Sequence, residues 1–173
     1  MKHKFSIAII ALACSLMFLA FVPKPFAYIL SAVDPMNGAV KAKLEQSTAI
    51  LQTKGKTSTT SSSYTISGAK SAIRLKISET VFRSSSDKST LTMNPADYIS
   101  LYKLTTGKTN RSFTMNTDGS ANAALVPLVF SAEDYGFYKI GQANGLIAGE
   151  YAFIDKSTLT TDGKVTVWTF GID

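Results

Sequence analysis

The chain contains one cysteine and one histidine, Cys14 and His3, and both lie close to its N-terminus. Without the N-terminal segment the chain has neither residue. Nucleophilic catalysis of the Ser-His-acid or Cys-His type then has no base or thiol, and zinc loses its usual nitrogen and sulfur ligands. A disulfide is excluded as well, so the fold must depend on an apolar core, which about 140 residues are enough to bury.

The N-terminal segment has the composition of an export signal. Basic residues at positions 2 and 4 precede residues 5–22, which carry no charge, and this order is typical of a signal peptide. We predict a signal peptide over residues 1–27, with cleavage at Ala27 or at Ala32. Residues 5–22 also reach the lower limit for a membrane-spanning helix, so an uncleaved anchor is an alternative, and a lipoprotein attached through Cys14 is another.

Export determines the predicted localisation and the effective charge. The protein is expected to be secreted, periplasmic or in the cell envelope, with membrane contact only through the N-terminal segment if that segment is kept. Three basic residues and no acids precede residue 28, which leaves 15 basic residues against 12 acids, a net charge of +3 instead of +6. This small excess gives no reason to expect a nucleic-acid partner.

No long helical pattern is visible, and the rest of the chain alternates short apolar runs with turns. Residues 28–46 are interrupted by Pro and Gly and are predicted to be irregular or short helical. Residues 47–173 are predicted to form one all-β domain, an antiparallel immunoglobulin-like β-sandwich of about eight short strands preceded by the N-terminal apolar helix. Pro127 has no backbone N–H to donate to a neighbouring strand, so its strand should lie at an edge of a sheet or break at this residue.

Individual segments follow from the same patterns. Residues 94–97 have a capping Asn and a Pro at the first helical position, which predicts one helical turn. Residues 55–63 are predicted to be a polar loop, and residues 84–87 a turn. The predicted strands cover residues 47–53, 71–78, 89–93, 100–104, 111–116, 123–130 and 137–141, followed by the last two strands.

The last two strands carry the clearest signal. Leu146, Gly149 and Tyr151 have the spacing of a tyrosine corner, in which the phenol hydroxyl bonds the backbone of the preceding bend. Asp162 and Gly163 then supply a turn before residues 164–170, because Asp-Gly tolerates positive φ angles.

The sequence GLIAGEYAFI, followed by VTVWTFGID, resembles the C-terminal part of small secreted bacterial proteins of uncharacterised function with an immunoglobulin-like β-sandwich pattern. SGAKSAIRLK and MNPADYISLYKL belong to the same pattern. The resemblance consists of hydrophobic, Gly and Tyr positions, and it implies no catalytic residues.

Both faces of the final strand are apolar. Val165 and Val167 share one face, while Trp168 and Phe170 share the other, which is either covered by the N-terminal part of the chain or open to a partner. Tyrosines elsewhere could extend such a partner surface, and they are Tyr98, Tyr102, Tyr135 and Tyr138.

These observations favour a non-catalytic exported protein that acts through contact with a protein partner or through self-association. Binding of a carbohydrate or another envelope polymer through exposed aromatic rings is the alternative. A hydrolase based on Glu133, Asp134 and Glu150 is a third hypothesis, and it would require two acids to face each other across a cleft. No catalytic residue, metal ligand or cofactor is predicted, and the oxygen-rich residues 116–122 are interpreted as an ordinary turn.

Overall fold

The computed structural model describes residues 28–52, 61–86, 94–116, 118 and 120–173. Within these ranges the chain is all-β, and its strands form two mainly antiparallel sheets, as the sequence predicts. The strands in these ranges number fourteen rather than about eight. Five of them, β1, β2, β4, β6 and β8, form outside the predicted strands, and the predicted run over residues 123–130 is divided into β10 and β11. The predicted N-terminal helix and the predicted strand over residues 89–93 lie outside the described residues.

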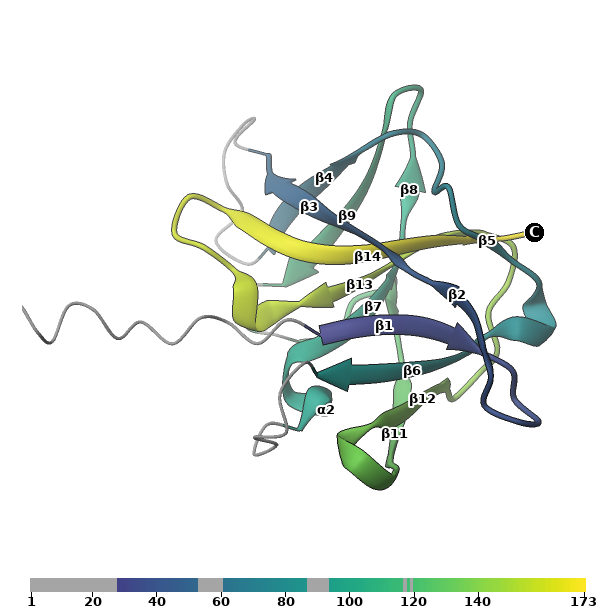
Figure 1. Cartoon of the computed structure of the whole chain (residues 1–173). Helices are drawn as coiled ribbons and strands as arrows, with labels where there is room; N and C mark the ends of the chain where they lie inside the picture. Colours follow the sequence, from purple (N-terminus) through teal and green to yellow (C-terminus); the bar gives the residue numbers. More distant parts are fainter. Residues whose placement is uncertain (1–27, 53–60, 87–93, 117, 119) are drawn as a thin grey trace, which may run out of the picture.

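The first sheet, called sheet A, has five strands in the order β11-β12-β6-β1-β2. It occupies the lower part of Figure 1, with β1 and β6 near the centre of the molecule. The strands of sheet A are β1 (Tyr28–Val33), β2 (Val40–Lys43), β6 (Val81–Ser86), β11 (Leu128–Ala132) and β12 (Tyr138–Gln142).

The second sheet follows the order β10-β7-β13-β14-β3-β4-β9-β8. β8 continues β7 after a single residue, so the two ends of this path meet and the sheet closes on itself. The closing strands, called the closed sheet, are β3 (Glu45–Leu51), β4 (Ser61–Ser67), β7 (Ile99–Lys103) with β8 (Thr105–Thr106), β9 (Asn110–Asn116), β13 (Gly149–Asp155) and β14 (Lys164–Ile172).

Short elements connect these strands. β10 pairs antiparallel with β7, whereas β5 pairs with β14 in parallel orientation. The short elements are β5 (Arg74–Leu75), β10 (Leu125–Val126), the helical turn α2 (Pro95–Tyr98), and the 3₁₀ turns η2 (Ile77–Glu79), η3 (Asp134–Gly136) and η4 (Lys156–Thr158). None of the helices among the described residues has the length and apolar character needed to cross a membrane.

Two apolar cores result from this arrangement. The inner core fills the closed sheet, and each of the six closing strands contributes to it with one face. The outer core lies between sheet A and the opposite face of β7, β13 and β14. Because β13 and β14 separate the two cores, both of their faces are buried, which accounts for their nearly continuous apolar sequences (Figure 1).

The structure corrects the prediction for residues 28–46. These residues form β1, β2 and the start of β3 instead of an irregular or helical segment. Pro35 and Gly38 interrupt only the hairpin turn, in which the Gly38 amide donates to the Asp34 carbonyl at 2.8 Å and Gly38 has a φ of +69°. Leu30 and Ala32 meanwhile alternate into the outer core, which is ordinary strand behaviour.

Three further segments differ from the prediction. Residues 71–78 contribute only the two-residue β5, because the backbone of Ser71 bonds a side chain instead of a neighbouring strand and Ile77 is exposed. The predicted turn at residues 84–87 is wrong over its first three residues, which extend β6. β4 begins inside the predicted polar loop, since Tyr64 and Ile66 point into the inner core and its serines take less buried positions.

Two local predictions are confirmed. Asn94 caps α2, and its side-chain oxygen accepts from the Ala96 amide at 3.1 Å. Pro127 separates β10 from β11, and β11 is an edge strand of sheet A. Proline at this point thus marks the place where the chain leaves one sheet and joins the other.

Candidate functional site

The predicted partner surface on the last strand is buried. Trp168 is 3% exposed and Phe170 is 0% exposed, and both pack in the outer core. Of the two alternatives for this face, the structure shows cover by the N-terminal part of the chain, and the prediction that Trp168 and Phe170 form a partner surface is wrong. The physical reason is that sheet A, which begins with the segment predicted to be irregular, covers this face of β14.

The tyrosines predicted to extend that surface differ in burial and come from different elements. Tyr102 is 5% exposed and belongs to the inner core, where its ring lies 5.4 Å from that of Phe113. Tyr98 in α2 and Tyr138 in β12 are partly exposed, and they lie on different elements. The backbone of Tyr135 lies in η3, and its side chain is outside the described part. Because Tyr102 is buried, it does not extend an exposed surface with Tyr98 or Tyr138.

The predicted corner has the required contacts. The Tyr151 hydroxyl donates to the Ile147 carbonyl at 2.8 Å, and the Ile147 amide donates back to the same hydroxyl at 3.3 Å. Gly149 has a φ of +148°, a region that side chains disfavour, and Leu146 packs in the outer core. Burial of the Tyr151 ring raises the pKa of the phenol, so the hydroxyl stays protonated and able to donate.

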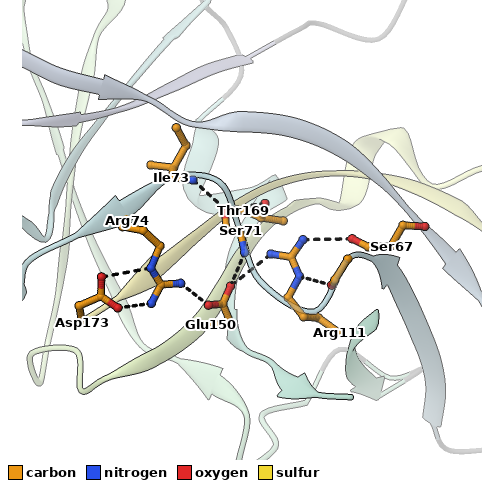
Figure 2. A network of polar contacts seen from close by, with 9 residues as sticks. Ser67, Ser71, Ile73, Arg74, Arg111, Glu150, Thr169 and Asp173 are labelled. Atoms are coloured by element: carbon orange, nitrogen blue, oxygen red, sulfur yellow. Dashed lines mark hydrogen bonds and ion pairs between the residues drawn. The ribbon is translucent and has the colours of Figure 1, made fainter. Parts of the chain in front are cut away.

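One end of the closed sheet is filled by charged groups, called the Glu150 network (Figure 2). Glu150 points into the closed sheet beside Arg111, and their side chains are 5% and 4% exposed. Oε2 of Glu150 accepts from Nη1 of Arg111 at 3.3 Å and from the Ser71 amide at 2.8 Å. Oε1 accepts from Nη1 of Arg74, while Nε and Nη2 of Arg74 donate to the Asp173 carboxylate.

The remaining donors of this network are also satisfied. Nε of Arg111 donates to the Gly68 carbonyl at 2.9 Å and Nη2 donates to the Ser67 carbonyl at 3.2 Å. The hydrogen bond to Asp173, and secondly that to Glu150, raises the pKa of Arg74. The buried Glu150 carboxylate thus has two guanidinium partners and one backbone donor. Its hydrogen bonds join β13 to β9 and to the segment around Ser71, and they close this end of the sheet.

The acids considered for hydrolysis do not face one another. Glu133 accepts from Nε of Arg83 at 2.8 Å beside sheet A, whereas Glu150 lies inside the closed sheet. Asp134 is exposed in η3. The arrangement required for a carboxylate-based hydrolase is therefore missing from these three residues.

The oxygen-rich segment over residues 116–122 uses its polar groups within a turn. Nδ2 of the Asn116 side chain donates to the Ser120 hydroxyl at 3.0 Å, and Nδ2 of the Asn122 side chain donates to the Thr114 carbonyl at 2.7 Å. Asp118 accepts from the Ser120 amide at 2.9 Å. Across the described ranges, no group of three or more His, Cys, Asp or Glu residues could hold a metal ion.

The other end of the closed sheet contains a pocket of about 280 Å³, called the open-end pocket. Its deepest residues are Tyr64 and Tyr102, which are 3% and 5% exposed, and Lys156 and Leu159 are exposed residues that line it. The pocket is lined by Ser62, Tyr64, Ser100, Tyr102, Met115, Asn116, Leu125, Lys156 and Leu159.

Strand periodicity explains why these residues converge. Ser62 and Tyr64 alternate on the inner face of β4, and Ser100 and Tyr102 alternate on the inner face of β7. β4 and β7 begin, and β9 and β13 end, at this end of the closed sheet, so their terminal inner residues surround one space. Burial raises the pKa of both Tyr64 and Tyr102, which keeps the phenols neutral.

Comparisons of this chain with protein-family models, with curated proteins and with solved structures found no match. The resemblance to small secreted bacterial proteins therefore stays a prediction, and the geometry of the pocket is the basis for assigning a function.

Sequence patterns alone identified one residue of this pocket, Tyr102, and assigned it to a different surface. Ser62 and Lys156 gave no signal, because each looks like an ordinary loop or surface residue until the sheet closes around it. The Glu150 network had one visible signal, since Glu150 alternates with Ala152 and Ile154 on a face that is otherwise apolar.

Proposed function

We propose that this chain is a non-catalytic binding protein that holds a small molecule in the open-end pocket. The observation that carries the proposal is the contrast between the two ends of the closed sheet. One end is closed by the Glu150 network, and the other ends in a pocket with two tyrosines at its base. Ligand sites are usually concave and mostly apolar, with a few polar groups that orient the ligand, and this pocket has that composition.

The pocket is suited to binding more than to chemistry. The lining residues that the structure describes include no Asp, Glu, His or Cys, and burial of Tyr64 and Tyr102 raises the pKa of their phenols and keeps them neutral. Ser62, Ser100 and Asn116 supply neutral hydrogen-bonding groups. These side chains can position a ligand through hydrogen bonds.

A fragment screen by ligand-observed NMR tests this proposal. Fragments of one or two rings, together with monosaccharides, are measured against the wild-type chain and two variants. Ser62→Phe fills the pocket from β4, whereas Ser131→Phe adds the same ring to an exposed position on β11. We expect some fragments to bind the wild type and Ser131→Phe but not Ser62→Phe. A screen without binders, or binders that Ser62→Phe retains, would contradict the proposal.

The same screen examines the carbohydrate alternative. Monosaccharides that compete for the open-end pocket would support it, and Tyr102 would then be the aromatic residue involved. Trp168 would not take part, because the outer core covers it.

Contact with a protein partner remains a second candidate, now through a different surface. β11 is an edge strand of sheet A, and Val129 on it is 53% exposed. A hollow of about 250 Å³ lies beside this edge, lined in part by Leu125, Pro127 and Phe130. An exposed edge can pair with an added strand, and a lysine on the edge opposes such pairing. Val129→Lys is expected to weaken any self-association measured by analytical ultracentrifugation, and unchanged association would exclude this edge.

Export is part of the proposal and rests on the N-terminal sequence, which lies outside the described residues. Mass spectrometry of the mature N-terminus, in secreted and envelope fractions, separates a cleaved protein from an anchored or lipidated one. A start at residue 28 or 33 supports cleavage, and an intact N-terminus supports the anchor over residues 5–22.

A further inference from the structure

The open-end pocket has a polarity gradient. The buried rings of Tyr64 and Tyr102 lie at its base, with the partly buried apolar side chains of Met115 and Leu125 beside them. The exposed Lys156 lies at its rim. A ligand that matches this gradient has its apolar part inside and its most polar group toward Lys156.

The charged group described in the pocket lining is the positive ammonium of Lys156. Among the described residues of the lining, Lys156 is the only one with a charged side chain, and it forms no ion pair with another described residue. Its neighbour Asp155 does not neutralise it through a contact. Asp155 lies on the opposite face of β13, is 0% exposed, and accepts from the Ser157 amide at 2.9 Å and the Ser157 hydroxyl at 2.6 Å.

The volume limits the size of the ligand. An engineered apolar cavity of about 150 Å³ is known to hold benzene. The open-end pocket, at about 280 Å³, has room for one aromatic ring with a short polar extension. Larger polymers could enter only with one terminal unit.

We infer that the ligand of the open-end pocket is a small aromatic carboxylate, whose ring packs against Tyr64 and Tyr102 and whose carboxylate pairs with Lys156. This inference rests on the proposed function. One ammonium with nearby hydroxyl and amide groups suits a monoanion, whereas a phosphate group is usually held by guanidinium groups or several backbone donors. Ser100 and Asn116 are placed to hydrogen-bond the second carboxylate oxygen or a ring substituent.

The test compares matched acids and amides. Benzoate and phenylacetate are titrated into the full chain by isothermal calorimetry or NMR, beside benzamide and phenylacetamide. We expect each acid to bind at least about tenfold more tightly than its amide, a difference that added salt reduces. Equal binding of acid and amide would overturn the carboxylate assignment while leaving the pocket as a binding site. Failure of all four probes, together with an empty fragment screen, would instead contradict the proposed function.

Variants of Lys156 make the assignment specific. Lys156→Gln should reduce the affinity for the acids about tenfold and leave the amides unchanged, and Lys156→Arg should restore most of the lost affinity. Lys139→Gln is the matched control, because Lys139 is an exposed lysine on β12 of sheet A, outside the pocket lining. Acid binding that Lys156→Gln and Lys139→Gln reduce equally would show only a general charge effect and would overturn the inference.

Discussion

The Glu150 network allows a quantitative prediction for stability. Glu150→Gln keeps the shape of the side chain but removes the charge that faces Arg111 and Arg74. Removing one member of a buried ion pair costs about 3–5 kcal/mol, because the other charge stays buried without compensation. Arg111 keeps the Ser67 and Gly68 carbonyls as acceptors, and Arg74 is partly exposed, so we expect the lower end of that range, about 3 kcal/mol.

Urea unfolding followed by circular dichroism measures this loss. With a typical dependence on urea, a loss of about 3 kcal/mol lowers the unfolding midpoint by roughly 1–3 M without changing the slope. Asp173→Asn is the control, because it removes the charge of the other acid that pairs with Arg74. The Asp173 side chain is 67% exposed, so the loss of stability should be much smaller. If Glu150→Gln shifts the midpoint no more than Asp173→Asn, the network does not stabilise the closed sheet.

Three other predictions concern separate parts of the fold. Tyr151→Phe removes the corner hydrogen bonds and should cost about 0.5–1.5 kcal/mol in the same assay, whereas no loss would show that water replaces the hydroxyl. Burial raises the pKa of Asp155, so ionisation of this carboxyl should lower the stability of the wild type as pH rises from the ordinary aspartate pKa through the raised value. The stability of Asp155→Asn relative to wild type should therefore improve as pH rises above the ordinary aspartate pKa, and a constant difference would contradict this. Trp168 is the only tryptophan, and its emission should be blue-shifted and shielded from acrylamide, whereas easy quenching would place it at the surface.

The sequence predicts much of the architecture because strand alternation and turn residues are local signals. The apolar pattern of residues 149–155, the Pro127 break and the Asn94 cap all act within a few residues. The prediction for residues 28–46 fails because Pro35 and Gly38 were taken to interrupt a whole segment, although they shape only the turn between β1 and β2.

The closure of the second sheet could not be predicted in the same way. It depends on contacts between strands far apart in the chain, such as β7 with β13 and β4 with β9. The two apolar faces of β14 were recognised, with cover by the N-terminal part of the chain as one of two explanations. Which explanation holds is decided by the position of sheet A. The open-end pocket follows from that closure, and its residues have nothing in common along the chain except their place at strand ends.

Chemical-shift mapping of the isotope-labelled chain with benzoate tests the account most directly. Binding in the open-end pocket predicts changes in the backbone signals of Ser62, Ser100, Asn116 and Lys156, with little change around Ser71 and Arg74 at the opposite end of the closed sheet. Changes confined to the outer strands of sheet A, or no changes at saturating benzoate, would contradict the assignment of this pocket as the binding site.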